Sequence, residues 1–170
     1  MSKWYVHKDW DSKLGTPCEV SDYMQRAIDS KGPSDKNIVM PEDFVKHCEE
    51  KKIIWSGHKN LAIVDLAYNL HDRAKAGGKT IRKIIQAEDL KFLLAKGDDY
   101  VKAYYLHFIL DYLDHSTNRQ LIQMGDSIAR CIDRYKKNKV ADVPEMSQHL
   151  TCVMDFLKSH SQEVKKDLDL

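Results

Sequence analysis

The stretch DDYVKAYYLHFILDYLDH, from Asp98 to His115, holds the densest run of apolar side chains in the chain and decides its predicted fold. On a helix of 3.6 residues per turn, most of these apolar side chains occupy one broad arc. The members of the arc are Val101, Tyr105, Leu106, Phe108, Ile109, Tyr112 and Leu113. So broad an arc needs several neighbouring helices to bury it. We therefore predict that residues 98–115 form the central helix of an all-α fold, with Asp98 as its cap.

Start and stop signals on either side of this stretch predict six further helices. The expected segments are residues 16–31, 41–52, 58–76, 81–96, 116–137 and 142–164. Within residues 81–96 the apolar positions before and after Ala87 are out of phase, which predicts a kink or two short helices. Gly125 falls inside the segment 116–137, where a helical glycine costs about 1 kcal/mol relative to alanine. We expect that helix to continue through it.

The predicted architecture is a single all-α domain of about seven helices over residues 16–170. Residues 1–15 show no helical period in their apolar side chains and are expected to form an irregular N-terminal arm. Short, glycine-punctuated connections favour antiparallel packing of consecutive helices. A compact orthogonal bundle and a short stack of helical hairpins both satisfy this pattern.

The amino-acid composition argues against some classes of function and indicates where the protein is located. Hydrophobic residues make up 42% of the 170 residues and charged residues 31%, and the net charge is +1. So balanced a charge argues against binding to nucleic acid or to an anionic membrane through a global field. The N-terminus lacks the apolar core of a signal peptide, and the four cysteines include no close pair. We therefore expect an intracellular protein, cytoplasmic or nuclear, that is not secreted and does not enter a membrane.

Histidine and aspartate cluster on the predicted central helix. His107 and Asp111 are one helical turn apart, and Asp114 and His115 follow on the same side. Imidazole and carboxylate groups so spaced could converge on a divalent ion. The opposing interpretation is that an amphipathic helix needs a polar side, which histidine and aspartate commonly occupy.

A second set of such residues lies earlier in the chain. His47 falls on the second predicted helix, and the pair His71-Asp72 falls near the end of the third. A histidine, a His-Asp pair and a distant aspartate on separate helices resemble the HD phosphohydrolase family. The resemblance implies a divalent metal ion that activates water to attack phosphorus. Its ligands would be His47, His71, Asp72 and either Asp111 or Asp114.

Aromatic residues suggest a different role. Trp4 and Trp10 lie in the expected N-terminal arm, and Trp55 follows the second predicted helix. Large aromatic side chains commonly anchor protein–protein contacts, so all three are candidate partner-binding residues. The alternative is that they fill the core.

Residues 81–159 also resemble the small helical bundles of the TFIIS N-terminal type, including their integrase-binding relatives. The similarity lies in the order of the helices and in the rhythm of Leu110 to Leu113, Ile128, Ile132 and the turn at 135–140. The resemblance implies binding of short linear peptides.

The leading hypothesis is a non-enzymatic adaptor or regulatory module that needs no cofactor. It would bind another protein through a groove between helices or through the aromatic arm. The alternative is the metal-dependent phosphohydrolase. A third hypothesis, ranked below both, is nucleic-acid binding by a basic stretch near the end of the helix predicted at 116–137. This stretch comprises Arg130, Arg134, Lys136, Lys137 and Lys139.

Overall fold

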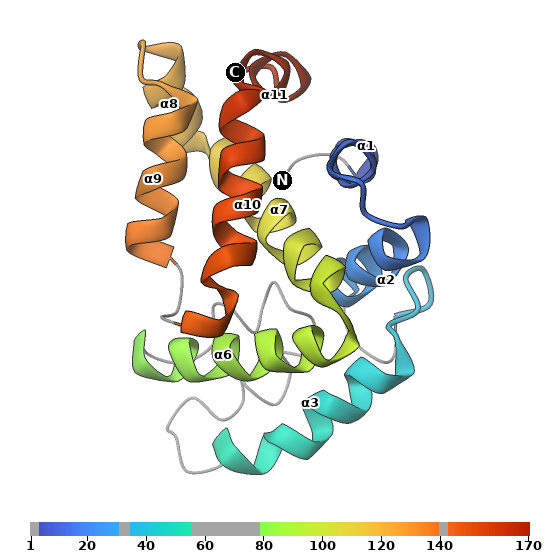
Figure 1. Cartoon of the computed structure of the whole chain (residues 1–170). Helices are drawn as coiled ribbons and strands as arrows, with labels where there is room; N and C mark the ends of the chain where they lie inside the picture. The colour runs from blue at the N-terminus through green and yellow to red at the C-terminus, as the bar shows by residue number, and fades with distance from the viewer. Residues whose placement is uncertain (1–3, 31–34, 56–78, 140–142) are drawn as a thin grey trace. The chain divides into compact units, whose positions relative to one another are not determined.

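A computed structural model of the protein describes residues 4–30, 35–55, 79–139 and 143–170. Over these ranges the regular structure is helical, without a strand (Figure 1). The predicted all-α class is therefore confirmed. The helix expected at 58–76 lies outside the described residues. None of the described helices combines the length and the apolar character that a membrane span requires.

The chain forms two compact units. The N/C unit consists of Met1–Ser21 and Gly97–Leu170, and the middle unit consists of Asp22–Lys96. Residues 1–15 thus belong to the same unit as the C-terminal half of the chain. The single-domain organisation expected for residues 16–170 stays a prediction.

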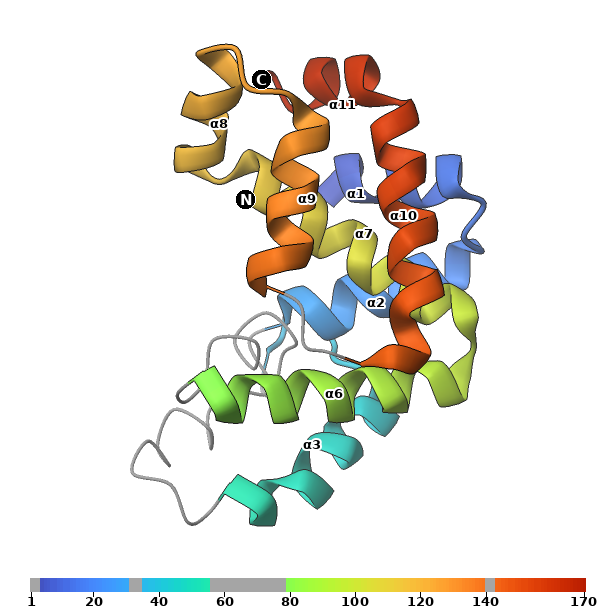
Figure 2. The same cartoon turned by 60° about the vertical axis from the view of Figure 1, so that its left-hand side comes forward.

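The N/C unit is built on α7 (Asp98–Asp114), which confirms the central helix predicted from the sequence. Four helices pack against it: α1 (Trp4–Leu14), α8 (Ser116–Gln123), α9 (Ile128–Lys139) and α10 (Ser147–Ser159). Helices α9 and α10 lie side by side in both views (Figures 1 and 2). A 3₁₀ turn, η1 (Pro144–Met146), precedes α10, and α11 (Ser161–Asp167) follows it.

Helix α7 is buried on more sides than its apolar arc alone would require. Tyr105, Ile109 and Leu113 of the predicted arc are at most 1% exposed. His107 was expected on the polar side, yet it is only 3% exposed. The reason is that α1 packs on this side, where the ring of His7 stacks on the ring of His107.

The expectation of an irregular arm at residues 1–15 is wrong, because α1 occupies Trp4–Leu14. The buried side chains of α1 are Val6, His7, Trp10 and Asp11. Their spacing is helical, but two of the four are polar. A search for apolar periodicity therefore missed the buried face of this helix.

Two predicted helices are divided in the structure. The segment 116–137 breaks into α8 and α9 around Gly125, whose φ is +108°. Glycine adopts this backbone conformation without the steric cost that an L side chain would meet. The last predicted helix is likewise divided into η1, α10 and α11, with a break at His160.

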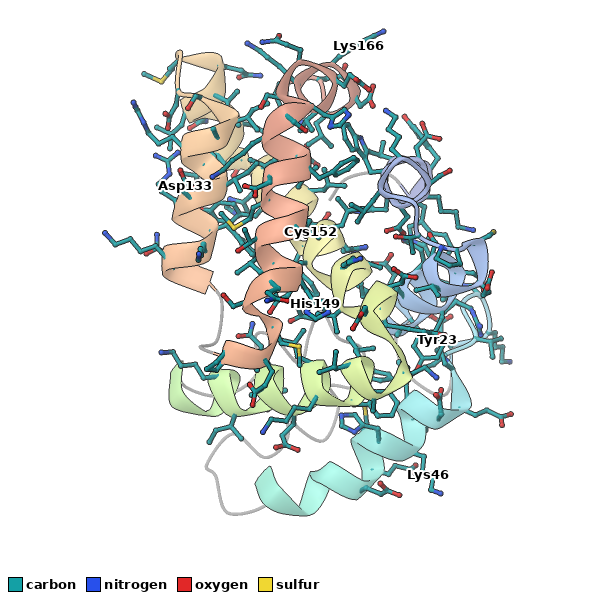
Figure 3. The ribbon with its side chains drawn as sticks, in the orientation of Figure 1. Tyr23, Lys46, Asp133, His149, Cys152 and Lys166 are labelled. Carbon is teal, nitrogen blue, oxygen red and sulfur yellow. The ribbon has the colours of Figure 1, made fainter. Side chains whose placement is uncertain are left out.

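The start of α7 also differs from the expectation. Gly97, with φ +148°, is the residue that precedes the helix, and Asp98 lies in its first turn without a side-chain capping bond. Instead, Asp98 Oδ1 lies 3.0 Å from His149 Nε2. His149 is at the beginning of α10 and is labelled in Figure 3. Asp98 therefore ties α7 to α10.

The middle unit contains most of α2 (Cys18–Asp29), α3 (Glu42–Trp55) and α6 (Lys79–Lys96). The Phe44 ring of α3 lies 6.0 Å from the Phe92 ring of α6. Tyr23 of α2 donates a hydrogen bond of 3.0 Å to Asp43, and Lys96 lies over the Tyr23 ring. These contacts join the three helices.

One of the two alternatives predicted at Ala87, a pair of short helices, is wrong. Helix α6 is continuous from Lys79 to Lys96. The apolar side chains of this continuous helix do not all face inward. Ile84 is 46% exposed, while Ile85, Leu90 and Leu93 are buried. The second predicted helix, expected at 41–52, extends to Trp55 in the structure as α3.

Candidate metal-binding site

Two histidines and one aspartate meet between α1 and α7 of the N/C unit. His7 comes from α1, while His107 and Asp111 come from successive turns of α7. One potential ligand atom from each residue can be chosen so that all three lie within 4.8 Å of one another. We refer to these three residues as the His7–His107–Asp111 cluster.

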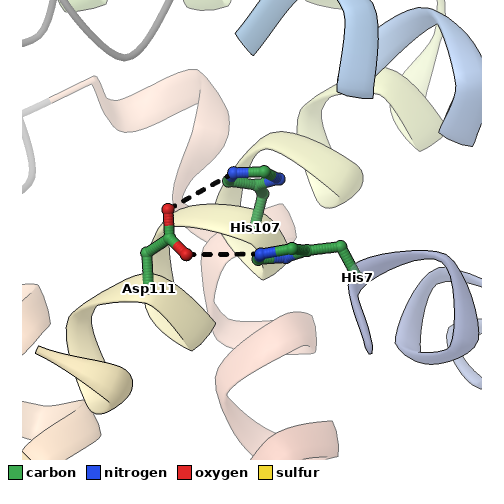
Figure 4. Close-up of side chains that lie close together, drawn as sticks. All are labelled: His7, His107 and Asp111. Carbon is green, nitrogen blue, oxygen red and sulfur yellow. Dashed lines mark ion pairs between the residues drawn. The ribbon is translucent and has the colours of Figure 1, made fainter. Parts of the chain in front are cut away.

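The Asp111 carboxylate lies beside the two stacked imidazoles and faces one edge of each ring (Figure 4). Its Oδ1 is 3.2 Å from His7 Nε2, and its Oδ2 is 3.4 Å from His107 Nε2. The two rings stack with centroids 3.8 Å apart and planes 11° apart. Each imidazole therefore turns the same nitrogen toward its own carboxylate oxygen.

The cluster is largely removed from water. His7 and His107 are 2% and 3% exposed, and the Asp111 side chain is 16% exposed. Burial disfavours the charged form of the Asp111 carboxyl, but hydrogen bonds and Coulombic attraction from His107 and His7 outweigh it. Together they hold the pKa of this carboxyl well below its usual range. Asp111 is thus a buried carboxylate at neutral pH.

The spacing of the ligand atoms can be compared with that of a transition-metal site. Bonds from such an ion to imidazole nitrogen and carboxylate oxygen are about 2.0–2.2 Å long, so neighbouring ligand atoms of a tetrahedral site are about 3.4 Å apart. In the cluster, His7 Nε2 is 3.2 Å from Asp111 Oδ1, and His107 Nε2 is 3.4 Å from the other carboxylate oxygen, Oδ2. One ligand atom from each residue can be chosen within 4.8 Å of the other two, so binding of a single ion would require the side chains to move closer together.

The sequence around the cluster repeats on its two helices. Both α1 and α7 carry a His-x-x-x-Asp pattern, His7 with Asp11 and His107 with Asp111. Asp11 is 3% exposed and accepts a hydrogen bond of 2.5 Å from Ser21 Oγ. Each helix thus buries an imidazole and a carboxylate one turn apart.

Part of this cluster was predicted and part was missed. His107 and Asp111 were expected to converge because they are one helical turn apart, and the structure places both in the cluster. His7 was missed because residues 1–15 were expected to be irregular. The repeated His-x-x-x-Asp spacing was the signal in the sequence that could have indicated it.

The ligand set implied by the HD phosphohydrolase resemblance is not assembled within the described residues. His71 and Asp72 lie outside them. His47 belongs to the middle unit, where its Nε2 is 2.8 Å from Asp89 Oδ1 and its ring stacks on Phe92. Asp111 has the partners given above, in the other unit. This ligand set stays a prediction.

Asp114 and His115 do not join the cluster. Asp114 pairs with Arg119, whose guanidinium also donates hydrogen bonds to the carbonyl oxygens of Leu168 and Asp169. His115 ends α7 and is exposed. These contacts hold the C-terminal turn of the chain against α8.

Trp10 and Trp4 lie in different environments. Trp10 is fully buried and meets the rings of Phe156 and His160 edge to face, so it is a core residue. Of the two interpretations of Trp10 offered by the sequence, this burial agrees with core filling. Trp4 is 39% exposed. Trp55 is the last residue of α3, and its side chain is outside the described part of the structure.

The basic stretch on α9 is partly neutralised. Asp126 Oδ1 lies 3.2 Å from Arg130 and its Oδ2 lies 2.6 Å from Arg134. Two of the five basic residues considered for nucleic-acid binding are therefore paired within the unit.

No protein-family model, curated protein or solved structure matches the chain. The resemblances to HD phosphohydrolases and to TFIIS-type bundles stay predictions from the sequence.

Proposed function

We propose that this protein binds a divalent transition-metal ion at the His7–His107–Asp111 cluster. The observation that carries the proposal is that two imidazole nitrogens and a carboxylate, from two helices, lie within 4.8 Å of one another. Three protein ligands of this kind leave coordination positions for water or another ligand.

Charge supports the proposal. The Asp111 carboxylate is mostly buried, with 16% of its side chain exposed. Buried charges in proteins are commonly paired with other charges or coordinate metals. A metal ion binds imidazole in its neutral form, so the three ligands together would carry a charge of −1, which a divalent cation would more than offset. The alternative is a purely structural triad, in which both imidazoles donate hydrogen bonds to the carboxylate.

The donor set selects the class of metal. Imidazole suits Zn²⁺, Fe²⁺, Ni²⁺ and Cu²⁺, whereas Mg²⁺ and Ca²⁺ prefer sites made of oxygen alone. Two of the three candidate ligands are nitrogens. We therefore expect Zn²⁺ to bind and millimolar Mg²⁺ not to compete with it.

Zinc titration tests the proposal. The protein is stripped with a chelator and titrated with Zn²⁺ against a chromophoric competitor, and the bound zinc is counted by elemental analysis. We expect one equivalent per chain in the wild type. His107→Gln should weaken the binding at least about 100-fold, because even residues behind the metal ligands contribute 10–100-fold.

His149→Gln is the matched control. His149 also lies next to an aspartate in the same unit, at 3.0 Å from Asp98, but it is outside the cluster. Its replacement should leave zinc affinity unchanged. A folded wild type that binds no zinc, or binds it equally well in the His107→Gln variant, would show that the cluster is a structural hydrogen-bonded triad.

As a second candidate function we propose binding of another protein through the N-terminal end of α1. Trp4 and Tyr5 favour it, because these neighbouring aromatic residues are 39% and 63% exposed. Exposed aromatic side chains are frequent anchors of protein–protein contacts. This candidate retains the leading hypothesis from the sequence, with Trp4 and Tyr5 in place of Trp10.

Substitution at these two positions tests the second candidate. For a given partner, the Trp4→Ala/Tyr5→Ala variant should lower affinity at least about tenfold in calorimetry, as expected for the loss of anchor residues. Met124→Ala is the control, because Met124 is an apolar residue of the same unit and is 85% exposed. Equal affinity of the double variant and the wild type would exclude these residues from the contact.

A further inference from the structure

We infer that a metal ion at the His7–His107–Asp111 cluster controls how firmly the N-terminal half of α1 is held on α7. The inference rests on the proposed metal-binding function and adds a regulatory consequence to it. Metal supply would then set the state of the N-terminal helix.

The origin of the ligands leads to this inference. His107 and Asp111 belong to α7, and of the three ligands only His7 belongs to α1. An ion bound by all three would therefore cross-link the two helices. Its bonds of about 2.0–2.2 Å would replace a contact of 3.2 Å between His7 and Asp111.

Other contacts hold the C-terminal half of α1. Trp10 packs against Phe156 with ring centroids 5.8 Å apart. Lys13 lies 3.1 Å from Asp167 and 3.4 Å from Glu163, both on α11. These contacts do not depend on a metal. They would keep this half of the helix in place whether or not an ion is bound.

The N-terminal half of α1 is more exposed to solvent. Trp4 and Tyr5 are 39% and 63% exposed, whereas Val6 and His7 are buried. Helix ends open locally at little free-energy cost unless tertiary contacts hold them. His7 lies in the first turn of α1, so a bond from His7 to an ion would act near this end.

The geometry of the two rings indicates which histidine would move when an ion binds. Because the two imidazole planes differ by only 11°, the Nε2 atoms face the carboxylate side by side and do not aim at one point. Coordination of a single ion therefore requires one ring to tilt toward the other. His107 is on the central helix of the unit, so we expect His7 and the adjoining turn of α1 to make this adjustment.

Hydrogen exchange of the wild-type protein tests the inference. Exchange is measured by mass spectrometry with and without Zn²⁺, and native mass spectrometry counts zinc in the same samples. Amides of residues 4–11 should exchange about tenfold more slowly with zinc, because a ligand of the closed state suppresses local opening. Amides of α9 should be unaffected, because α9 contributes no ligand.

The outcomes separate the inference from the function on which it rests. Zinc bound with unchanged exchange in residues 4–11 would overturn the inference and leave metal binding in place. No bound zinc would overturn both. Because this comparison uses only the wild type, it does not depend on the folding of a variant.

His7→Gln provides the second measurement. It should abolish the zinc-dependent slowing in residues 4–11, while residual zinc remains on His107 and Asp111 at high concentration. His149→Gln, as the control, should retain the slowing. If zinc slows exchange in the His7→Gln variant as much as in the wild type, the ion does not act through His7 and the inference is wrong.

Discussion

Replacing Trp10 with alanine is expected to lower the free energy of unfolding by about 3–5 kcal/mol, as is usual when a large core aromatic is removed. Trp10 is fully buried, its ring meets Phe156 and His160 edge to face, and Lys13 Nζ lies 4.3 Å from its centroid. Alanine would forfeit the transfer free energy of the indole and leave a cavity between α1 and α10. Urea unfolding followed by circular dichroism measures the loss.

Tyr5→Ala is the control for Trp10→Ala. Tyr5 is an aromatic residue of the same helix but is 63% exposed. Its replacement should change the free energy of unfolding by no more than about 0.5 kcal/mol, as is usual at exposed positions. A Trp10→Ala loss as small as that of Tyr5→Ala would contradict the packing of α1 described above.

Replacing Phe44 with alanine is expected to destabilise the middle unit by a similar amount, about 3–5 kcal/mol. Phe44 is fully buried, with ring centroids 5.9 Å from His47 and 6.0 Å from Phe92. The cavity would adjoin the buried His47–Asp89 pair, whose Nε2 and Oδ1 atoms are 2.8 Å apart. Hydrogen exchange should therefore accelerate in α3 and α6.

Val39→Ala is the matched control for Phe44→Ala. Val39 is an apolar residue of the same unit, but it is 64% exposed. Its replacement should leave both the unfolding free energy and the exchange of α3 and α6 nearly unchanged. If Phe44→Ala behaves like Val39→Ala, the packing described for α3 on α6 is wrong.

Two of the three residues of the candidate site could be predicted from the sequence. The pair His107 and Asp111 could be found because both lie on one helix, where a spacing of four residues brings side chains together. His7 is a hundred residues away, and sequence spacing carries no information on such a distance. The prediction also treated the polar side of α7 as solvent-exposed, whereas His107 is 3% exposed.

The tertiary structure also decided which of the two tryptophans of α1 is exposed to solvent. Trp4 and Trp10 are six residues apart on α1, and the sequence treats them alike. In the structure Trp10 is buried and Trp4 is 39% exposed. The difference follows from the side of α1 that faces α7 and α10, which depends on partners from the other end of the chain.

By itself, the sequence determined the all-α class, the central position of α7 and the approximate span of α2, because these follow from local periodicity and from helix start and stop signals. Only the tertiary structure decided that residues 4–14 are helical and cover the polar side of α7. The physical reason is that the buried face of α1 includes His7 and Asp11, which are polar and become favourable in the interior only with partners such as Asp111 and Ser21. Burial of these residues depends on long-range pairing, which no local pattern encodes.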